Sequence, residues 1–322
     1  VERLDLVAQT LAVFKTVLGL NIGRISEGEF EPGFITVSTI QTLTRKIKED
    51  RVKKYLKSVE VLILDEAQNL SGGKGEFRDR YLVLLDLLQN AYFRVAISGT
   101  LFQRGDLGDA YLMGCFGGIV STLKAKTLSD QGLLARPKIK MIHITTPGMQ
   151  QLQGREVYNE AIVGNYERNQ IIVELSEIAY RKAPTFILVR LSKHGKLLQK
   201  MLKAEGIEAP FLNYRIDTLE RQKAIADFDS FKIPILISSS IFEEGINVVN
   251  LRFLIIAGGG KSAVRTIQRL GRGLRNKKLG ANTVHVADFL DDTHQRLLDN
   301  SQYRLSAYRR EDHEVKIIRR SI

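Results

Sequence analysis

Two adjacent carboxylates follow a short apolar run in the first half of the chain. Val61–Leu64 is apolar, and Asp65 and Glu66 come directly after it. In parallel α/β sheets, ligands bind beyond the carboxyl ends of the strands. An acid at such a position can hold Mg²⁺ beside a nucleoside triphosphate, and a second carboxylate can orient or deprotonate an attacking water. The same residues also fit a plain strand followed by a helix that Asp65 caps, and the local pattern leaves both interpretations open.

A second pattern, QRLGRGLR, is rich in guanidinium groups and occupies residues 268–275. On a helix, Gln268, Arg272 and Arg275 lie at positions i, i+4 and i+7 and therefore share one face. Planar guanidinium groups match phosphate oxygens, and glycines permit a close approach of the backbone. The alternative is an exposed basic helix, but two glycines would weaken such a helix without benefit. The spacing therefore favours phosphate recognition.

Basic residues are in clear excess, with a formal net charge of +12 and a pI of about 9.7. Residues 245–287 contain eight Lys and Arg residues and no Asp or Glu. A polyanionic partner is the simplest reason for such a surplus, because clustered positive charge attracts phosphates. A basic but inert surface is the alternative that the total charge leaves open.

Short apolar runs alternate with helical patterns along the chain. This alternation predicts parallel α/β sheets with helices on both faces, and strands without polar alternation suit a sheet that is buried on both sides. The predicted strands are Ile35–Val37, Val59–Leu64, Arg94–Ile97, Thr185–Val189, Ile233–Ile237 and Phe253–Ala257. The predicted helices include Asp79–Gln89, Lys193–Glu205 and Thr218–Phe228, with a longer helical stretch over Arg155–Arg181.

A break in this pattern at Thr145–Gln153 predicts two domains. The segment contains Pro147, Gly148 and several polar residues, which are typical of a connection. We expect the first domain over residues 1–146 and the second over residues 154–322. A chain of 322 residues is long enough to bury two sizeable cores.

Composition argues against several classes of protein. A single cysteine, Cys115, excludes an internal disulfide framework and a zinc site built from cysteines. The five histidines show no metal-ligand spacing, and no apolar run approaches the roughly 20 residues that span a bilayer. Charged residues interrupt the first 30 positions, so we expect no signal peptide and a cytoplasmic location.

Several motifs together resemble those of the superfamily 2 helicases. DEAQ at 65–68, SGT at 98–100, EEGINV at 243–248 and QRLGRGLR at 268–275 occur in the order and approximate spacing of that family's motifs II, III, V and VI. Residues 3–9, 38–43 and 186–190 resemble motifs Ia, Ib and IV, so the resemblance covers nearly the whole chain. It implies an α/β fold of two RecA-like domains with mostly parallel sheets flanked by helices, of which the first is incomplete.

The resemblance also implies a role for each matching residue. Asp65 would bind the Mg²⁺ of Mg·ATP, and Glu66 would position the attacking water. Gln268, Arg272 and Arg275 would reach the phosphates across an interdomain cleft, with Arg275 as the arginine finger. Ser98 and Thr100 would couple the nucleotide state to domain movement. The remaining expectations are nucleotide contacts by Gly245 and Asn247, and nucleic-acid contacts by Arg3, Thr39, Gln41, Arg190, Ser239 and Lys261.

The chain departs from the family pattern in two places. Asn247 stands where the family most often has Asp, which puts a contact to the ribose or to the other domain in doubt. No G-x-x-x-x-G-K-[ST] pattern precedes Asp65, although the family's phosphate-binding loop lies upstream of motif Ia. A similar string, Gly258–Ser262, lacks the first glycine of that pattern because Ile255 occupies its position. We interpret it as a flexible turn that faces the cleft or the nucleic-acid backbone.

These observations predict an ATP-dependent DNA helicase or translocase that uses ATP and Mg²⁺. Gln268 disfavours the DEAD-box RNA helicases, which usually have His there. The GRGLR ending and residues 286–298 look more like phage branch-migrating helicases and restriction-enzyme-type DNA motors. The alternatives are a nucleic-acid-binding module without ATPase activity and an RNA helicase. Because the phosphate-binding loop is absent, we expect the 322 residues alone to be a poor ATPase.

Overall fold

The computed structural model describes residues 4–67, 70, 76–98, 107–131, 135–213, 216–239, 251–260 and 283–319. The chain divides into two compact units, Val1–Ser121 and Thr122–Ile322. This division differs from the boundary expected at Thr145–Gln153. The physical reason is β5 (Arg136–Ile144), which pairs along its length with two strands of the second unit and so belongs to that unit's sheet.

The first unit contains two small parallel sheets. β1 (Gly23–Ile25) pairs with β2 (Thr36–Ser38), and β3 (Val61–Leu64) pairs with β4 (Phe93–Ala96). Leu62, Leu64 and Ala96 pack into a core of buried helix residues, because alternate side chains of a strand point to the same face. The helices that the described residues of this unit form are α1 (Leu4–Leu18), α2 (Ile40–Arg45), α3 (Asp50–Ser58), α5 (Glu76–Leu87) and α6 (Leu107–Phe116).

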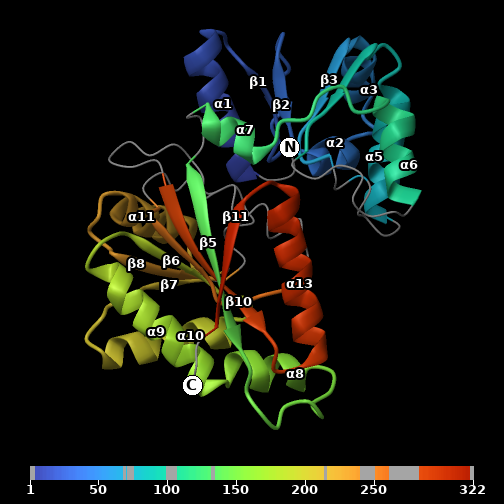
Figure 1. Ribbon diagram of the computed structural model, residues 1–322. Coiled ribbons are helices and arrows are strands. Elements are labelled where there is room, and N and C mark those ends of the chain that lie inside the picture. Colours follow the sequence, from blue (N-terminus) through green and yellow to red (C-terminus); the bar gives the residue numbers. More distant parts are fainter. Residues whose placement is uncertain are drawn as a thin grey trace. The chain divides into compact units, whose positions relative to one another are not determined.

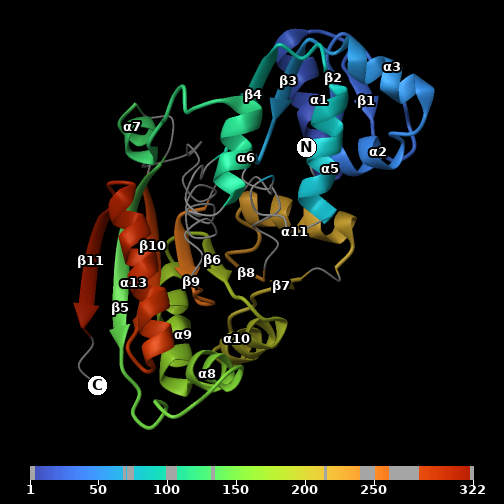
Figure 2. The same ribbon diagram turned by 90° about the vertical axis from the view of Figure 1, so that its right-hand side faces the viewer.

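The second unit is built around a seven-stranded sheet in which every pair of neighbouring strands is parallel. The strand order is β11-β5-β10-β9-β6-β8-β7, and Figure 2 shows β11, β5 and β10 side by side. Its strands after β5 are β6 (Thr185–Leu188), β7 (Phe211–Leu212), β8 (Ile235–Ser238), β9 (Phe253–Ile256), β10 (Thr283–Asp291) and β11 (Glu314–Arg319).

Helices connect these strands, as parallel pairing requires (Figure 1). Among the described residues, the connecting helices are α8 (Glu156–Tyr158), a π-helical turn at Asn159–Val163, α9 (Tyr166–Tyr180), α10 (Ser192–Ala204), α11 (Thr218–Asp229) and α13 (Gln295–Arg310), while α7 (Ala125–Asp130) precedes β5. The long helical stretch expected over Arg155–Arg181 is therefore interrupted before α9.

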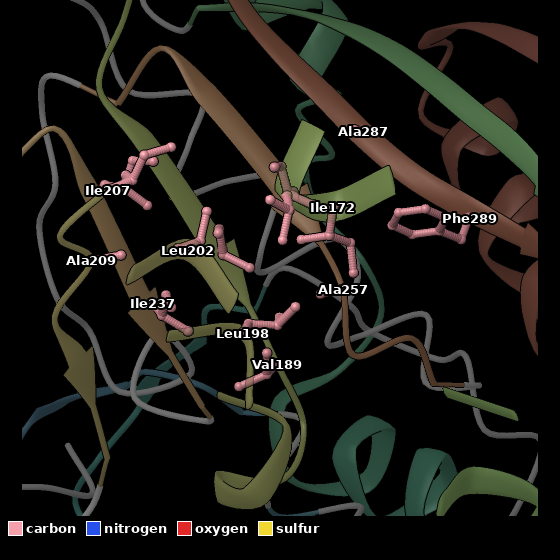
Figure 3. Packing of buried hydrophobic residues seen from close by; sticks show 14 of the residues in the cluster. Ile172, Val189, Leu198, Leu202, Ile207, Ala209, Ile237, Ala257, Ala287 and Phe289 are labelled. Carbon is pink, nitrogen blue, oxygen red and sulfur yellow. The ribbon is translucent and has the colours of Figure 1, made fainter. Parts of the chain in front are cut away.

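Apolar cores lie on both faces of the large sheet. On one face, α9 and α10 bury side chains such as Ile172 and Leu198 against Ile237 and Phe289 of the strands (Figure 3). On the other face, Phe228 of α11 and Tyr308 of α13 pack against a second set of strand residues. Every residue of β6 and β8 is buried, and this burial on both faces explains why their sequences show no alternation of polar and apolar residues.

The predicted elements correspond closely to the observed ones. All six predicted apolar runs form strands, and the three predicted helices appear as α5, α10 and α11 with bounds shifted by at most three residues. The α/β class with a large parallel sheet between helices is therefore confirmed. Within the described ranges, no helix is both long enough and apolar enough to cross a membrane.

Candidate functional site

The carboxylates Asp65 and Glu66 lie in a turn that is fastened to the neighbouring strand. β3 and β4 pair in parallel register, with Leu64 opposite Ala96. The amide of Ile97 donates to the carbonyl oxygen of Leu64 at 2.9 Å, and the amide of Ala67 donates to the carbonyl oxygen of Ile97 at 3.0 Å. These two backbone hydrogen bonds hold Ala67 beside Ile97, the residue that precedes Ser98.

The conformation of this turn presents the two acids differently. Asp65 is exposed, Glu66 is half-buried, and Ala67 is buried in the core of the first unit. One oxygen of Asp65 accepts a hydrogen bond from the amide of Glu66 at 2.9 Å. Glu66 has a φ of 51°, which lies in the left-handed region that residues other than glycine rarely adopt. Such strain is common at functional sites, where surrounding structure enforces it.

The chemistry of the turn fits a magnesium ion that is held mainly by a nucleotide. No group of three or more His, Cys, Asp or Glu side chains that would cage a metal occurs among the described residues. Mg²⁺ commonly binds one or two carboxylates and takes its remaining ligands from water and substrate phosphates. The exposed carboxylate of Asp65 suits this mode, and Glu66 beside it suits the positioning of a water.

The structure gives Thr39 a structural task in the first unit. Its side chain is 2% exposed, and its hydroxyl caps α2 by accepting from the amide of Thr42 at 3.3 Å. Gln41 lies in the first turn of the same helix and is half-buried. Thr39 therefore holds the start of α2, and the expected contact of its side chain with nucleic acid has little exposed surface available.

Several expected residues of the second unit lie at one edge of its sheet. Arg190 follows β6, Ser239 follows β8, and Gly258–Gly260 follows β9. Carboxyl ends of neighbouring parallel strands meet at one edge, where ligands bind in open α/β sheets. Arg190 is exposed and its guanidinium lies 5.1 Å from the ring centroid of Tyr158. Ser239 is only 5% exposed.

Two buried ion pairs join strand β10 of this sheet to helices α9 and α13. The Nε of Arg168 donates to Asp291 at 2.7 Å, and Arg168 lies over the ring of Phe289. Arg304 donates to both oxygens of Asp288, at 2.8 and 3.0 Å. Burial disfavours the charged guanidinium of Arg304, but the Asp288 carboxylate outweighs burial and raises the pKa of Arg304.

Sequence reasoning missed these buried pairs. Asp288 and Asp291 interrupt the apolar run of β10, and acids in a buried strand must be paired because an isolated buried charge is very costly. That signal predicts buried basic partners, but it does not say which of the many basic residues they are. Helices α9 and α13 supply them as Arg168 and Arg304.

Eight of the expected site residues lie outside the described residues, and the structure does not test their roles. They are Arg3, Thr100, Gly245, Asn247, Lys261, Gln268, Arg272 and Arg275.

Comparison with protein families identifies the region that contains most of these residues. Residues 167–277 match the family described as "Helicase conserved C-terminal domain". The match begins in α9 and includes the whole QRLGRGLR pattern at 268–275.

Several curated relatives of the chain are helicases or a translocase by name. The ATP-dependent DNA helicase uvsW of Enterobacteria phage T4 is 28% identical over 265 residues, which are 80% of this chain and 50% of that protein. The DNA 3'-5' translocase XPB2 of Sulfurisphaera tokodaii is 26% identical over 152 residues, which are 47% of this chain and 28% of that protein. The chain spans about half the length of the first curated relatives it matches.

Solved structures show the same fold. S. cerevisiae Dbp5 bound to RNA and ADP BeF3 aligns with a TM-score of 0.65 and 19% identity, over 99% of this chain and 76% of that chain. A fragment of a putative HsdR subunit of a type I restriction enzyme from Vibrio vulnificus aligns with a TM-score of 0.64 and 14% identity, over 92% of this chain and 54% of that chain. The fold is thus similar to that of RecA-like helicase domains, and the two relatives in sequence named above are a helicase and a translocase.

Proposed function

We propose that this chain, which carries a helicase C-terminal domain at residues 167–277, forms most of an ATP-driven motor that moves along DNA. The observation that carries the proposal is the turn at Asp65 and Glu66, fastened to Ser98 by the hydrogen bond from Ala67 to Ile97. It presents an exposed carboxylate for Mg²⁺ and a second carboxylate for water, directly beside the segment expected to transmit the nucleotide state. The QRLGRGLR pattern within the matched domain supplies the arginines that would complete the chemistry.

In this proposal, residues from both halves of the sequence contact Mg·ATP. Asp65 holds the metal ion, Glu66 orients the attacking water, and Gln268, Arg272 and Arg275 contact the phosphates, with Gly245 and Asn247 nearby. Mg²⁺ supplies charge neutralisation of the phosphates when it is bound. Ser98 and Thr100 couple ATP hydrolysis to movement of the domains, because enzymes commonly use lid and domain motions that follow ligand binding. The protein would act in the cytoplasm.

DNA is the proposed track for two reasons. The relatives named above include a DNA helicase and a DNA translocase. Residues 245–287 carry eight basic residues without an acid, which suits contacts to phosphates that do not read the bases. Arg3, Gln41, Arg190 and Lys261 would contact the strand directly, and Thr39 and Ser239 would shape the surfaces around them. Migration of branched DNA is the most specific form of this proposal.

The test is an ATPase assay on residues 1–322 and on a natural polypeptide that contains this chain together with a phosphate-binding loop. We expect DNA to stimulate the longer protein more than RNA does, and Asp65→Asn and Glu66→Gln each to lower its turnover by about 10²- to 10⁴-fold. Residues 1–322 alone should hydrolyse ATP poorly, since no upstream loop holds the triphosphate.

Each other outcome points to a different function. Stimulation by RNA alone would make the protein an RNA helicase. DNA binding without turnover in the longer protein would make it a nucleic-acid-binding module. Full activity of residues 1–322 that Lys261→Ala abolishes would move the nucleotide site to the Gly258–Ser262 string.

A further inference from the structure

Strand β11 forms one edge of the seven-stranded sheet, and it differs from the strand at the opposite edge. β7 consists of two buried residues that directly follow Pro210. β11 has six residues, of which five are exposed and none is a proline. Among the described strands, β5 alone pairs with β11, and Figure 2 shows β11 as the outermost strand. Proteins commonly keep edge strands short or interrupt them with proline, because a free edge otherwise pairs with another chain.

Apolar side chains on both faces of β11 are exposed to solvent. Ile317 is 47% exposed and Ile318 is 39% exposed, and as neighbours in a strand they point to opposite faces. Val315, on the same face as Ile317, packs against the core that contains Tyr308 of α13. The core therefore ends near Val315, and the two isoleucines that follow lie beside the free edge. They offer apolar surface on each face to a strand that pairs there.

Lysines lie on one face of the sheet beside this edge. Lys316 of β11 lies opposite Lys140 of β5, and Glu314 lies opposite Lys138. All three lysines are exposed, and Lys138 and Lys140 form no ion pair with a described residue. Lys316 lies 3.6 Å from Glu314, but both side chains are exposed, and such pairs contribute little. This face is therefore positively charged and accessible to an acidic partner.

His285 of β10 lies on the same face and responds to these charges. It is opposite Lys138 in the sheet, and its ring stacks on that of Phe253 with 6.0 Å between the ring centroids. Burial, followed by the positive charges of Lys138 and Lys140, lowers the pKa of His285. The imidazole is therefore mostly neutral at pH 7, and the positive charge of this row of residues comes from the lysines.

We propose that the free edge of β11 binds an extended segment of a partner protein in which acidic and apolar residues alternate. The segment adds to the sheet as a further strand, because a free edge presents unpaired backbone N–H and C=O groups. Alternate side chains of the added strand point to opposite faces. The acidic side chains lie beside Lys316, with Lys140 one strand farther away, and the apolar side chains lie beside Ile317. This inference is independent of the proposed motor function.

Two other occupants fit the edge less well. A nucleic acid would use the lysines, but it would leave the backbone groups and the isoleucines of β11 without partners. A second copy of this chain carries the same net charge of +12 and would bring a second set of these lysines to the edge. Like charges that face each other across paired strands are destabilising. An acidic segment satisfies the charges, the apolar side chains and the backbone together.

The first test measures how peptides bind to residues 1–322 by fluorescence anisotropy. Each probe is a peptide of about eight residues in which Asp or Glu alternates with Val, Ile or Leu, and a small panel covers these combinations. The control for each probe has the same composition, with its acidic residues grouped at one end. Since the two peptides carry equal charge, we expect the alternating peptide to bind about 10-fold more tightly because several cross-strand contacts form together.

Hydrogen exchange shows whether the peptide binds as a strand. Amides that face a free edge exchange quickly, and pairing with an added strand protects them. We expect a saturating alternating peptide to slow exchange within residues 314–319 by about 10-fold, since each protected amide must first open. Methylation of every second peptide nitrogen gives two further probes. Only one of them keeps the amides that face β11, so one should bind and the other should not.

Lys316→Glu tests the charge at the edge, and Lys200→Glu is the matched control. Both positions are exposed and both variants change the net charge equally, but Lys200 lies on α10, which packs against β7 and β8 at the other end of the sheet. We expect Lys316→Glu to weaken binding of the alternating peptide by about 10-fold and Lys200→Glu by less than about twofold. An unchanged midpoint in urea unfolding shows that both variants remain folded.

Each of the following results would overturn the inference. Equal binding of alternating and grouped peptides would mean that charge alone attracts them, and equal binding of both methylated probes would mean that no strand is added. Protection of residues 314–319 by single-stranded DNA and by none of the peptides would assign the edge to nucleic acid. Protection that grows with protein concentration without peptide would assign it to a second copy. Failure of the whole panel to bind would leave β11 as an unused edge.

Discussion

The amide of Ala67 donates a 3.0 Å hydrogen bond to the carbonyl oxygen of Ile97, across the ends of two parallel strands. This bond extends the β3–β4 ladder by one residue beyond the strands themselves, and the chain reaches it only by turning sharply at Glu66. The positive φ of Glu66 is thus a consequence of keeping Asp65 and Ser98 at the same edge. The residue that we propose to position the attacking water is therefore placed in a strained conformation by the pairing of its neighbours.

This strain is measurable with two substitutions at one position. Glu66→Gly and Glu66→Ala remove the same carboxylate, so both should abolish ATP turnover in a longer, active protein. They differ in the left-handed region, where alanine keeps a steric penalty of about 1–2 kcal/mol that glycine lacks. Glycine also gives the unfolded chain more freedom, which offsets roughly half of that difference. We therefore expect Glu66→Gly to be more stable than Glu66→Ala by about 0.5–1 kcal/mol in urea unfolding.

The same pair at an ordinary helical position provides the control. At Lys200, an interior position of α10, glycine should be less stable than alanine by about 1 kcal/mol. If glycine is also the less stable of the two at position 66, then Glu66 is not strained in solution.

A second prediction concerns pH and the buried His194. Burial, followed by the positive charge of Arg168, lowers the pKa of His194 to about 3. Its Nε2 lies 2.9 Å from Oδ1 of Asn169, so the neutral ring is held by a hydrogen bond. Since the folded pKa lies below the unfolded value of about 6.5, the unfolded chain takes up the proton first as the pH falls. The contribution of His194 to stability is full above pH 6.5 and is lost as the pH falls toward 3.

We expect this histidine to account for a loss of about 2 kcal/mol in the free energy of unfolding between pH 7 and pH 5. His194→Gln, which has no titrating group, should flatten that part of the curve when urea unfolding is repeated at both pH values. Burial also lowers the pKa of His313 to about 4, against the opposing effect of Asp312. His313→Gln should therefore flatten the curve further and additively, because His194 lies in α10 and His313 lies in the turn between α13 and β11. An unchanged slope in both variants would contradict the prediction.

The sequence was sufficient to predict the elements whose pattern is local. β3 and the acids after it follow from an apolar run and its chemistry, and β6, β8 and β9 follow from apolar runs of the right length. The domain boundary did not follow, because Pro147 and Gly148 mark an ordinary loop between β5 and α8. Only the pairing of β5 with β10 and β11 shows to which unit that strand belongs.

Local sequence patterns could not reveal the buried ion pairs of the second unit or the buried cap in the first unit. Arg168 and Asp291 are 123 positions apart in sequence, and no periodicity connects them. Arg304 lies on a helix whose many charged residues are mostly exposed, so its burial depends on Asp288 in another element. The buried capping role of Thr39 is a similar case, since Ser and Thr before a helix are common both as caps and as surface contacts.

A third prediction tests the packing of α10 against β7. A Cβ atom at Gly195 would collide with the ring of Phe211, and both residues are buried. Gly195→Ala improves helix propensity by about 1 kcal/mol but overpacks a dense core, which typically costs about 1–3 kcal/mol. We expect a net loss of stability of up to about 2 kcal/mol in urea unfolding.

Phe211→Leu provides the matching partner for this test. The smaller side chain leaves a cavity when it is introduced alone, but it makes room for the methyl group of Gly195→Ala. The double variant should therefore be more stable than the sum of the two single effects predicts. Simple additivity would mean that the helix shifts to accommodate the methyl group.

The last prediction concerns where positive charge acts. Lys261 and Arg265 lie in the acid-free segment, whereas Arg136 and Lys138 are exposed in the first half of β5. Replacing either pair by alanine lowers the net charge by two. Parallel strands place the first half of β5 toward the opposite edge of the sheet from Gly258–Gly260. If nucleic acid binds at the edge that follows β9, only Lys261→Ala with Arg265→Ala removes direct phosphate contacts. The slope of log affinity against log salt should then fall by about two in that variant and change little in the other.

Titrations of single-stranded DNA at several salt concentrations above about 0.1 M measure both slopes, because charges farther away than the Debye length of about 10 Å are screened there. Equal changes in the two variants would mean that binding follows the net charge of the protein and not the edge of the sheet.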